Sequence, residues 1–332
     1  MARSGMAAHK QDMCTVVREP LAKYHGLWAD TCGSLNWNCL FMLPPWIDAW
    51  LQHFGTGREP HIYKVSSADG LLGIAPLLVS GGTASLIGSA DVCDYLDFIV
   101  APGRQKDFFT ALVTHLRQQG IGALDLGPLR PDSAAQAHFG CNKGSCSQED
   151  ISYELALPPG WDSYLSGLTV QQRHEVRRKL RRLQEAGRFA YRIVDAPEAI
   201  DAAMDMFLHL FMISRPDKRA FMTAAMEAFF RSLSRSMADC GLLRLGFLDI
   251  NGEPAAAVMC FEYSATVYLY NSGFDPQFRH LNAGFLCKVL SIRDSLESGK
   301  KIYDFLKGAE VYKQRLGGAP VPLQRCRVML QD

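Results

Sequence analysis

The sequence predicts a mixed α/β protein, an α+β arrangement in which two related halves share one set of elements. Two observations carry this prediction. In each half, three short apolar runs separated by glycine-containing turns precede an amphipathic helix and a closing strand. Matching positions also keep a nearly constant offset, because Gly70 and Gly252 are 182 residues apart while Asp125 and Asp304 are 179 apart. The alternative is that two common αβ patterns coincide.

The first half contains these elements in order. We expect strands at 61–67, 71–80 and 84–89, a helix at 105–119 and a strand at 123–129. Asp69–Gly70 and Gly81–Gly82 mark the turns between the strands. The uncharged stretch 70–90 has the length of a membrane span. Its five glycines and Pro76 favour two buried strands instead.

The second half begins after a polar loop at 141–150 and a short strand at 151–157. The Pro-Pro-Gly sequence at 158–160 then marks a boundary, which predicts domains 1–157 and 158–332. We expect helix at 163–186 with a break near Gly167, because Thr169 and Gln172 form a capping-box pattern. A strand at 189–194 and helices at 197–213 and 218–239 follow.

The repeated unit of the second half comes next. It comprises strands at 242–250, 253–263 and 266–274, a helix at 283–298 and a strand at 301–306. Asn251–Gly252 is a strong hairpin signal. The crossover through the helix into the last strand should be parallel and right-handed.

The composition is that of an ordinary globular protein. Of 332 residues, 48% are hydrophobic and 21% are charged, which excludes a disordered chain. The formal net charge of +1 conceals an asymmetry, since residues 1–158 carry a net charge of −4 and the remainder +5. A basic second half suits an anionic ligand.

The ten cysteines show no disulfide or metal framework. No CxxC occurs, and the closest pairs include Cys141 and Cys146. We therefore expect reduced thiols, no metal site and, since the first residues lack the apolar core of a signal peptide, a cytoplasmic protein. The chain also lacks GxxxxGK[ST], GxGxxG, HExxH and GxSxG, which removes sequence support for P-loop, Rossmann, zincin and serine-hydrolase chemistry.

The junction at 274–290 is a candidate phosphate site. A strand ends there, a loop carries Arg279 and His280, and a helix begins near Asn282. The first N–H groups of a helix are unpaired and lie at the positive end of its dipole, and small residues let an anion approach them. In the simpler alternative, Asn282 only caps the helix and Gly284 allows close packing on the sheet.

Two further stretches carry candidate chemistry. Six of the ten residues at 173–182 are Lys or Arg, and Arg177 lies in an i, i+4 ladder. This face suits phosphates of a cofactor, an acidic polysaccharide or RNA, or it is only a solvated surface. The stretch 303–318 places Glu310, Tyr312 and Lys313 after a strand, where they can transfer protons or simply form a charged edge loop.

Four stretches together resemble the GNAT-fold acyltransferase family named for cellulose biosynthesis (CelD/BcsL), which is similar in layout to the tandem-GNAT Fem aminoacyltransferases. They are DYLDF at 94–98, the basic helix after WDSYLSGL, YLYNSGFDP at 268–276 and YDFLKGAEVYKQRLG at 303–317. The last motif is the most specific. The resemblance implies a tandem GNAT-like fold, in which 1–157 supports the site and lines the acceptor cleft while 158–332 binds the donor and performs catalysis.

The resemblance also implies an activity. An acyl group would move from acetyl-CoA, a longer acyl-CoA or another acyl thioester to an amine or hydroxyl acceptor, in polysaccharide or cell-envelope metabolism. The implied donor-binding residues are Gln277, Arg279, His280, Asn282, Ala283, Gly284 and Phe285, and the implied acceptor-binding residues are Asp94, Tyr95, Arg177, Tyr270 and Asp275.

The same resemblance assigns catalytic roles. Glu310 would act as the base and Tyr312 would protonate the leaving thiolate. Asp304 would orient the loop, and Lys313 would hold the acceptor or a donor phosphate. Two alternatives stay open: an aminoacyl-tRNA-dependent Fem-like transferase that binds RNA through the basic helix, and a non-catalytic GNAT-fold binding protein. Neither DNA, a membrane span nor a metal is expected.

Overall fold

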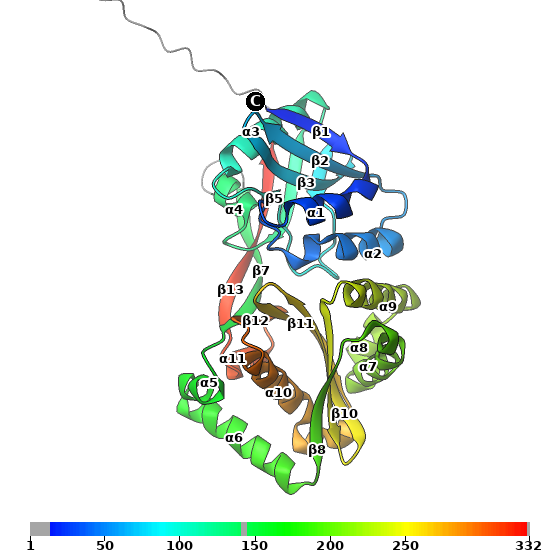
Figure 1. The fold of residues 1–332 in the computed structure, drawn as a ribbon, viewed down its shortest axis with the longest axis vertical. Coiled ribbons are helices and arrows are strands. Elements are labelled where there is room, and N and C mark those ends of the chain that lie inside the picture. The colour runs from blue at the N-terminus through cyan, green and yellow to red at the C-terminus, as the bar shows by residue number, and fades with distance from the viewer. Residues whose placement is uncertain (1–13, 141–144, 331–332) are drawn as a thin grey trace, which may run out of the picture.

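The computed structural model describes residues 14–140 and 145–330. Figure 1 shows two lobes, the upper one formed mainly by the first half and the lower one by the second, with β7 (Ser145–Ala156) and β13 (Ala319–Met329) running between them. The first half contains β1 (Thr15–Glu19), α1 (Tyr24–Thr31), α2 (Pro44–Phe54), β2 (Pro60–Ser67), β3 (Gly70–Ser80), β4 (Thr83–Leu86), β5 (Ile99–Val100), α3 (Gln105–Gln118), β6 (Ala123–Leu129) and α4 (Ala134–Phe139).

The second half contains more helices. After β7 come α5 (Trp161–Gly167), α6 (Val170–Glu185), β8 (Phe189–Val194), α7 (Ile200–Ser214), α8 (Pro216–Phe221), α9 (Ala224–Asp239), β9 (Leu243–Ile250), β10 (Glu253–Tyr263), β11 (Thr266–Phe274), the 3-10 helix η4 (Pro276–Leu281), α10 (Ala283–Glu297), β12 (Ile302–Lys307), α11 (Val311–Arg315) and β13. The expected break near Gly167 is confirmed, because α5 ends there and Thr169 and Gln172 form a capping box at the start of α6.

Three element predictions are wrong. The polar loop expected at 141–150 is wrong over 145–150, because these residues pair with β13 and extend the expected strand at 151–157 into the longer β7. Residues 141–144 lie outside the described residues. The strand expected at 84–89 ends at Leu86. The helix expected at 218–239 is divided into α8 and α9, because the Thr223 hydroxyl accepts a hydrogen bond from the Met226 N–H and so begins a new helix.

The two halves repeat one strand order, as the sequence pattern predicts. The order is β1-β2-β3-β4-β6 in the first half and β8-β9-β10-β11-β12 in the second. Within each set the neighbouring strands are antiparallel, except that the closing pairs, β4 with β6 and β11 with β12, are parallel. The predicted parallel crossover is therefore confirmed.

The strand that completes each half comes from the other half. β7 pairs with β12, β13 pairs with β6, and β7 and β13 pair with each other, so one sheet continues through both lobes. The boundary between 157 and 158 stays a prediction, but residues 319–329 lie beside the first half although they follow the second in sequence.

The expectation that the cysteines are reduced is wrong for one pair. Cys146 on β7 lies directly opposite Cys326 on β13, with a Cα–Cα distance of 4.1 Å, and the two form a disulfide. Their separation of 180 residues gives no spacing signal in the sequence. Cys141 lies outside the described residues.

Helices cover both faces of the second-half sheet. α10 packs on one face and α7 on the other (Figure 1), and Leu165 of α5 and Val176 and Leu183 of α6 are buried beside α10. α9 packs against α2 of the first half, where the rings of Phe54 and Phe229 lie 5.0 Å apart. Within residues 14–140 and 145–330, no helix combines the length and hydrophobicity needed to cross a bilayer.

Candidate active site

The separation of two parallel strands creates the main cavity. β11 and β12 pair only from Thr266 to Tyr268 and from Ile302 to Asp304, and beyond these residues they diverge. A cavity of about 430 Å³ opens where they part. It is lined by the end of β11, the start of α10, the end of β12 and the loop into α11, together with residues of α8. On the cavity side, the backbone beyond Tyr268 has no paired strand, so its N–H groups can reach a ligand.

The start of α10 forms one end of this cavity. Asn282 is the N-cap residue of α10, as expected, but it has a left-handed backbone (φ 58°) and its side chain makes no capping hydrogen bond. A Cβ on Gly284 would lie 3.0 Å from the Phe274 ring, which confirms the close helix–sheet packing that glycine permits. The N–H groups of Asn282 and Phe285 donate to the carbonyls of Arg279 and Asn282, whereas those of Ala283 and Gly284, the first two residues of the 15-residue helix, have no acceptor within their own helix. All four residues line the cavity. Close packing and an anion site are therefore compatible here.

The opposite end is a backbone kink at the end of β12. Leu306 is buried and has a left-handed backbone (φ 60°), which is rare for a residue of this size. The Asp304 carboxylate accepts the Leu306 N–H at 2.8 Å, and the Asp94 carboxylate accepts the Lys307 N–H at 3.0 Å. Lys313 donates to the carbonyl oxygens of Leu306 and Lys307 at 2.9 and 2.6 Å. Side chains from both halves thus hold one strained turn.

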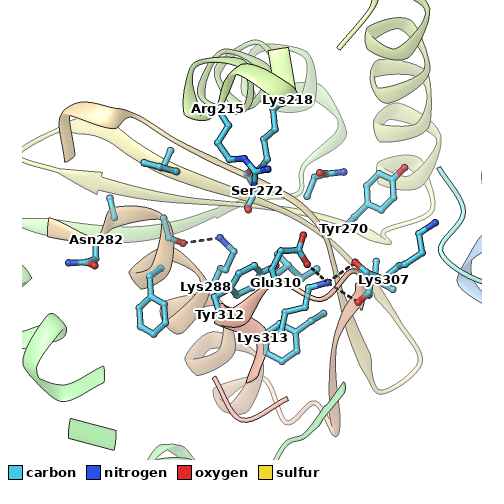
Figure 2. Close-up of a pocket in the computed structure, with 18 of the residues that line it drawn as sticks. Arg215, Lys218, Tyr270, Ser272, Asn282, Lys288, Lys307, Glu310, Tyr312 and Lys313 are labelled. Carbon is cyan, nitrogen blue, oxygen red and sulfur yellow. Dashed lines mark hydrogen bonds and ion pairs between the residues drawn. The ribbon is translucent and has the colours of Figure 1, made fainter. Parts of the chain in front are cut away.

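Glu310 and Lys313 form an ion pair beside this turn. Their Oε2 and Nζ atoms are 3.0 Å apart, and Figure 2 shows both side chains directed toward the cavity. Partial burial favours a higher pKa for Glu310, but the charge and hydrogen bond of Lys313 outweigh it and lower the pKa. Glu310 is therefore ionised at neutral pH. Gly308 has a backbone φ of 111°, which side-chain-bearing residues rarely adopt, and this favours glycine at this position of the motif.

Tyr312 lines the cavity close to this ion pair and is half-buried. Burial raises the pKa of its phenol, and the nearby Glu310 carboxylate acts in the same direction. The hydroxyl consequently keeps its proton throughout the neutral range. Lys288 of α10 lies over the ring, with its Nζ 4.7 Å from the ring centroid.

Asp304 and Tyr95 lie together, but behind the cavity. The Tyr95 hydroxyl donates to the Asp304 carboxylate at 2.8 Å, and the Arg130 guanidinium lies 3.3 Å from the same oxygen. Burial raises the pKa of Asp304 to about 6 against the opposing effect of Arg130. Asp304 thus holds the β12 turn, as an orienting residue would. Tyr95 faces a smaller pocket of the first half instead of the main cavity.

Two other predicted acceptor residues, Asp94 and Tyr270, line the cavity and also join the halves. The Tyr270 hydroxyl donates to the Val92 carbonyl at 3.1 Å, and its ring packs edge-on against Trp46. Burial raises the pKa values of Asp94 and Tyr270. The first half therefore contributes directly to one wall of the cavity.

Several predicted residues do not line the cavity. Asp275 accepts a hydrogen bond from the Gln277 N–H and so begins η4, whose exposed His280 bonds the Gln277 carbonyl. Of the charged residues on η4, Arg279 does line the cavity. Arg177 is exposed in an open groove between α6 and α11, away from the cavity lining.

The cavity residues that the sequence reasoning missed include Arg215, Lys218, Ser272 and Lys288. The sequence does mark Lys288, because it is a charged residue within the otherwise apolar run at the start of α10. The structure shows that it is buried. The sequence does not mark Lys218, since it is only the first residue of the helix expected at 218–239 and follows a polar connection. Among the residues that the structure describes, no group of three or more His, Cys, Asp or Glu side chains is placed to hold a metal ion.

Comparisons with known proteins agree with this architecture. Residues 170–314 match the family model of the acetyltransferase (GNAT) domain. A crystal structure of FemX superposes with a TM-score of 0.65 at 11% identity, covering 96% of this chain and 98% of that chain. A Bacteroides thetaiotaomicron protein of unknown function gives a TM-score of 0.60 at 12% identity, covering 96% and 100%. A search of curated protein sequences finds no match.

A further similar structure is the C-terminal domain of a putative lysylphosphatidylglycerol synthetase from Agrobacterium fabrum. Its TM-score is 0.55 at 10% identity, covering 85% of this chain and 90% of that chain. At such identities the likeness shows the fold alone. The predicted tandem GNAT-like fold is confirmed, and the match to the acetyltransferase (GNAT) domain model lies within the second half. The resemblance to the CelD/BcsL family stays a prediction.

Proposed function

We propose that the protein is an acyltransferase that moves an acyl group from acetyl-CoA or a longer acyl-CoA to an amine or hydroxyl acceptor. The observation that carries the proposal is the divergence of β11 and β12, which opens a cavity between a helix N-terminus and an ionised carboxylate. Its volume of about 430 Å³ lies in the ordinary range of small-molecule sites.

The donor would enter from the start of α10. Its pyrophosphate is proposed to bind the N–H groups of Ala283 and Gly284 at the start of α10, assisted by Arg279 and by the positive end of the helix dipole. Gln277 and His280, on the exposed turn of η4, would contact the outer part of the donor. The thioester would then lie along the unpaired edge of β11, where a backbone N–H can stabilise the oxyanion.

The acceptor would be activated next to Glu310. The carboxylate takes the proton from the amine or hydroxyl as this nucleophile attacks the thioester carbonyl carbon. When the tetrahedral intermediate collapses, the carbon–sulfur bond breaks and the thiolate takes a proton from the Tyr312 hydroxyl or from water. Because Lys313 uses its ammonium on the Leu306 and Lys307 carbonyls and on Glu310, we propose that it positions this base.

The acceptor itself would lie against the first half, where Asp94 and Tyr270 form the wall. A saccharide or cell-envelope acceptor, as the CelD/BcsL resemblance implies, belongs to this proposal. Asp304 and Tyr95 would support the site from behind, through the β12 turn.

Calorimetric titration with acetyl-CoA and longer acyl-CoAs tests donor binding. Reversing the charge at Arg279 (Arg279→Glu) should weaken binding about tenfold or more, because a charge-assisted hydrogen bond is worth about 1.5–3 kcal/mol. Lys301→Glu makes the same charge change at an exposed residue just before β12, at the end of this strand away from the cavity, and should leave donor binding unchanged. Binding of aminoacyl-tRNA without any acyl-CoA binding would instead support the Fem-like alternative, and donor binding without turnover would support a binding protein.

A further inference from the structure

Two lysines in the cavity, the half-buried Lys218 and the buried Lys288, have no carboxylate partner among the described residues. Lys218 on α8 donates to the Ser272 carbonyl and lies 4.7 Å from the centre of the Phe211 ring. Lys288 on α10 donates to the Gly284 carbonyl at 3.0 Å and lies over Tyr312. Among the described residues, neither ammonium has an acidic group within ion-pair distance. Buried charges in proteins are normally paired, so this arrangement needs an explanation.

The acidic groups near these lysines are already engaged. Glu310 pairs with Lys313 at 3.0 Å, and Asp217 pairs with Arg215 at 2.6 Å. Asp94 accepts the backbone N–H of Lys307. Besides Arg279 and Lys307, the cavity therefore holds two further cations, Lys218 and Lys288, that no carboxylate of the described residues pairs with.

Both ammonium groups reach the same space from different elements. Figure 2 shows Lys218 extending from the helix above Ser272, and Lys288 extending from the helix that begins at Asn282. Burial lowers the pKa of Lys218 to about 7, and the charge of Lys288 contributes to this shift. Burial likewise lowers the pKa of Lys288 to about 8. Each ammonium has three donors and uses one on a carbonyl, so donors remain for a ligand.

We propose that Lys218 and Lys288 bind a carboxylate or phosphate group of the acceptor, so that the acceptor is an acidic amine or alcohol. This inference rests on the proposed acyl transfer for its choice of ligand. The donor's phosphates would bind at 282–285 and Arg279, at the start of α10, whereas Lys288 lies more than one turn further along this helix and Lys218 lies on α8. An anion between the two ammonium groups would neutralise both and form charge-assisted hydrogen bonds.

Anion binding can be measured by thermal shift, since a ligand that binds only the folded protein raises its melting temperature. The probes are inorganic phosphate and malonate, each compared with chloride at equal ionic strength. We expect at least one probe to raise the melting temperature above the chloride control, with phosphate and malonate distinguishing a phosphorylated from a carboxylated acceptor. Lys218→Met and Lys288→Met should each weaken the response about tenfold or more. Lys307→Met, a cavity lysine whose ammonium bonds the Ala90 carbonyl, should retain it.

Calorimetry at pH 8 adds a second measurement. Anion binding should take up protons, because it raises the lowered pKa values of both lysines. The apparent enthalpy should therefore depend on the ionisation enthalpy of the buffer in the wild type and not in the double methionine variant.

Three results would overturn the proposal. The first is that neither probe raises the melting temperature of the wild type, and the second is that Lys307→Met weakens this response as much as Lys218→Met and Lys288→Met do. The third is competition between the probes and bound CoA. Competition would assign the lysines to the donor. If CoA fails to bind while the lysine-dependent response persists, the proposed acyl transfer fails and the anion site stands.

Discussion

Lys313 combines the charge of a ligand-binding residue with the contacts of a structural one. Only 2% of its side chain is exposed, and its three donors are used by two backbone carbonyls and by Glu310. Asp304 behaves similarly, with its carboxylate accepting from Tyr95 and from the Leu306 N–H. Such residues fix the geometry of the site, while Glu310, half exposed at its rim, has oxygen atoms that can reach a substrate.

Glu310→Gln should lower turnover by about 10²-fold, the lower end of the usual range for a general base. The lower end applies because Lys313 lowers the pKa of Glu310 and thus makes it a weaker base. For the same reason, wild-type activity should fall on the acid side only below the ordinary glutamate pKa of about 4.3. Steady-state kinetics at saturating donor, with donor affinity measured separately, checks both points. Tyr312→Phe should lower turnover less than Glu310→Gln does, since water can protonate the thiolate. Full turnover in Glu310→Gln would place the base elsewhere.

Lys218→Met should raise the free energy of unfolding at pH 7 by about 1 kcal/mol or more, the equivalent of one pKa unit. The pKa of Lys218 is about 7 in the folded protein and about 10.4 in an unfolded chain. Between these values the unfolded state binds more protons, so the wild type gains stability as the pH rises. The advantage of the variant should therefore be largest near pH 7 and shrink toward pH 10. Urea unfolding of both proteins at pH 7 and pH 10 measures this advantage. If the variant and the wild type differ in free energy of unfolding by the same amount at both pH values, the pKa of Lys218 is not lowered by folding.

At the scale of elements, the end of β12 is the point where the two halves meet the site. The turn at Leu306 is held by Asp94 from the first half and by Lys313 from α11. Tyr95 and Arg130, both from the first half, hold Asp304. The DYLDF motif consequently acts on the cavity through backbone geometry, with only Asp94 facing the cavity itself.

Tyr95→Phe should destabilise the protein by about 1–3 kcal/mol, because it leaves a buried carboxylate oxygen with one donor fewer. Tyr164→Phe is a matched control, since that buried hydroxyl donates at 3.1 Å to a neutral carbonyl, that of Leu316. Tyr164→Phe should lower the free energy of unfolding less than Tyr95→Phe does, because hydrogen bonds to charged groups are stronger. Chemical unfolding of both variants makes the comparison. Equal costs would mean that Asp304 does not depend on the Tyr95 hydroxyl.

The elements that sequence reasoning finds are those with local signals. β10, β11 and the start of α10 follow from the Asn251–Gly252 turn and from apolar periodicity, and the structure gives their predicted bounds. β13 has no comparable signal, because Pro320 and Pro322 interrupt it and its partners lie far away in the sequence. The site divides in the same way: Glu310 and Tyr312 belong to a motif, whereas the position of Lys218 depends on how α8 folds over β11.

At the scale of the whole molecule, the exchange of β7 and β13 makes the two halves interdependent. The side chains of Leu323, Cys326, Val328 and Leu330 are buried in the same core as the first half, although they follow the second in sequence. The Cys146–Cys326 disulfide joins the exchanged strands where they pair. A reducing compartment would oppose this bond, so the disulfide and the expected cytoplasmic location correspond to different redox environments.

This exchange predicts which fragment of the second half is the folding unit. Residues 145–318 contain all six strands of the lower sheet, β7 through β12, whereas 158–332 lacks β7 and carries β13 without its partners. A fragment of 145–318 should therefore unfold cooperatively at a higher urea concentration than 158–332, which leaves the β12 edge unpaired. Both fragments expose the same α9 surface, so the comparison isolates the exchanged strands. Circular dichroism with urea titration measures it, and a more stable 158–332 would support the boundary that the Pro-Pro-Gly sequence suggests.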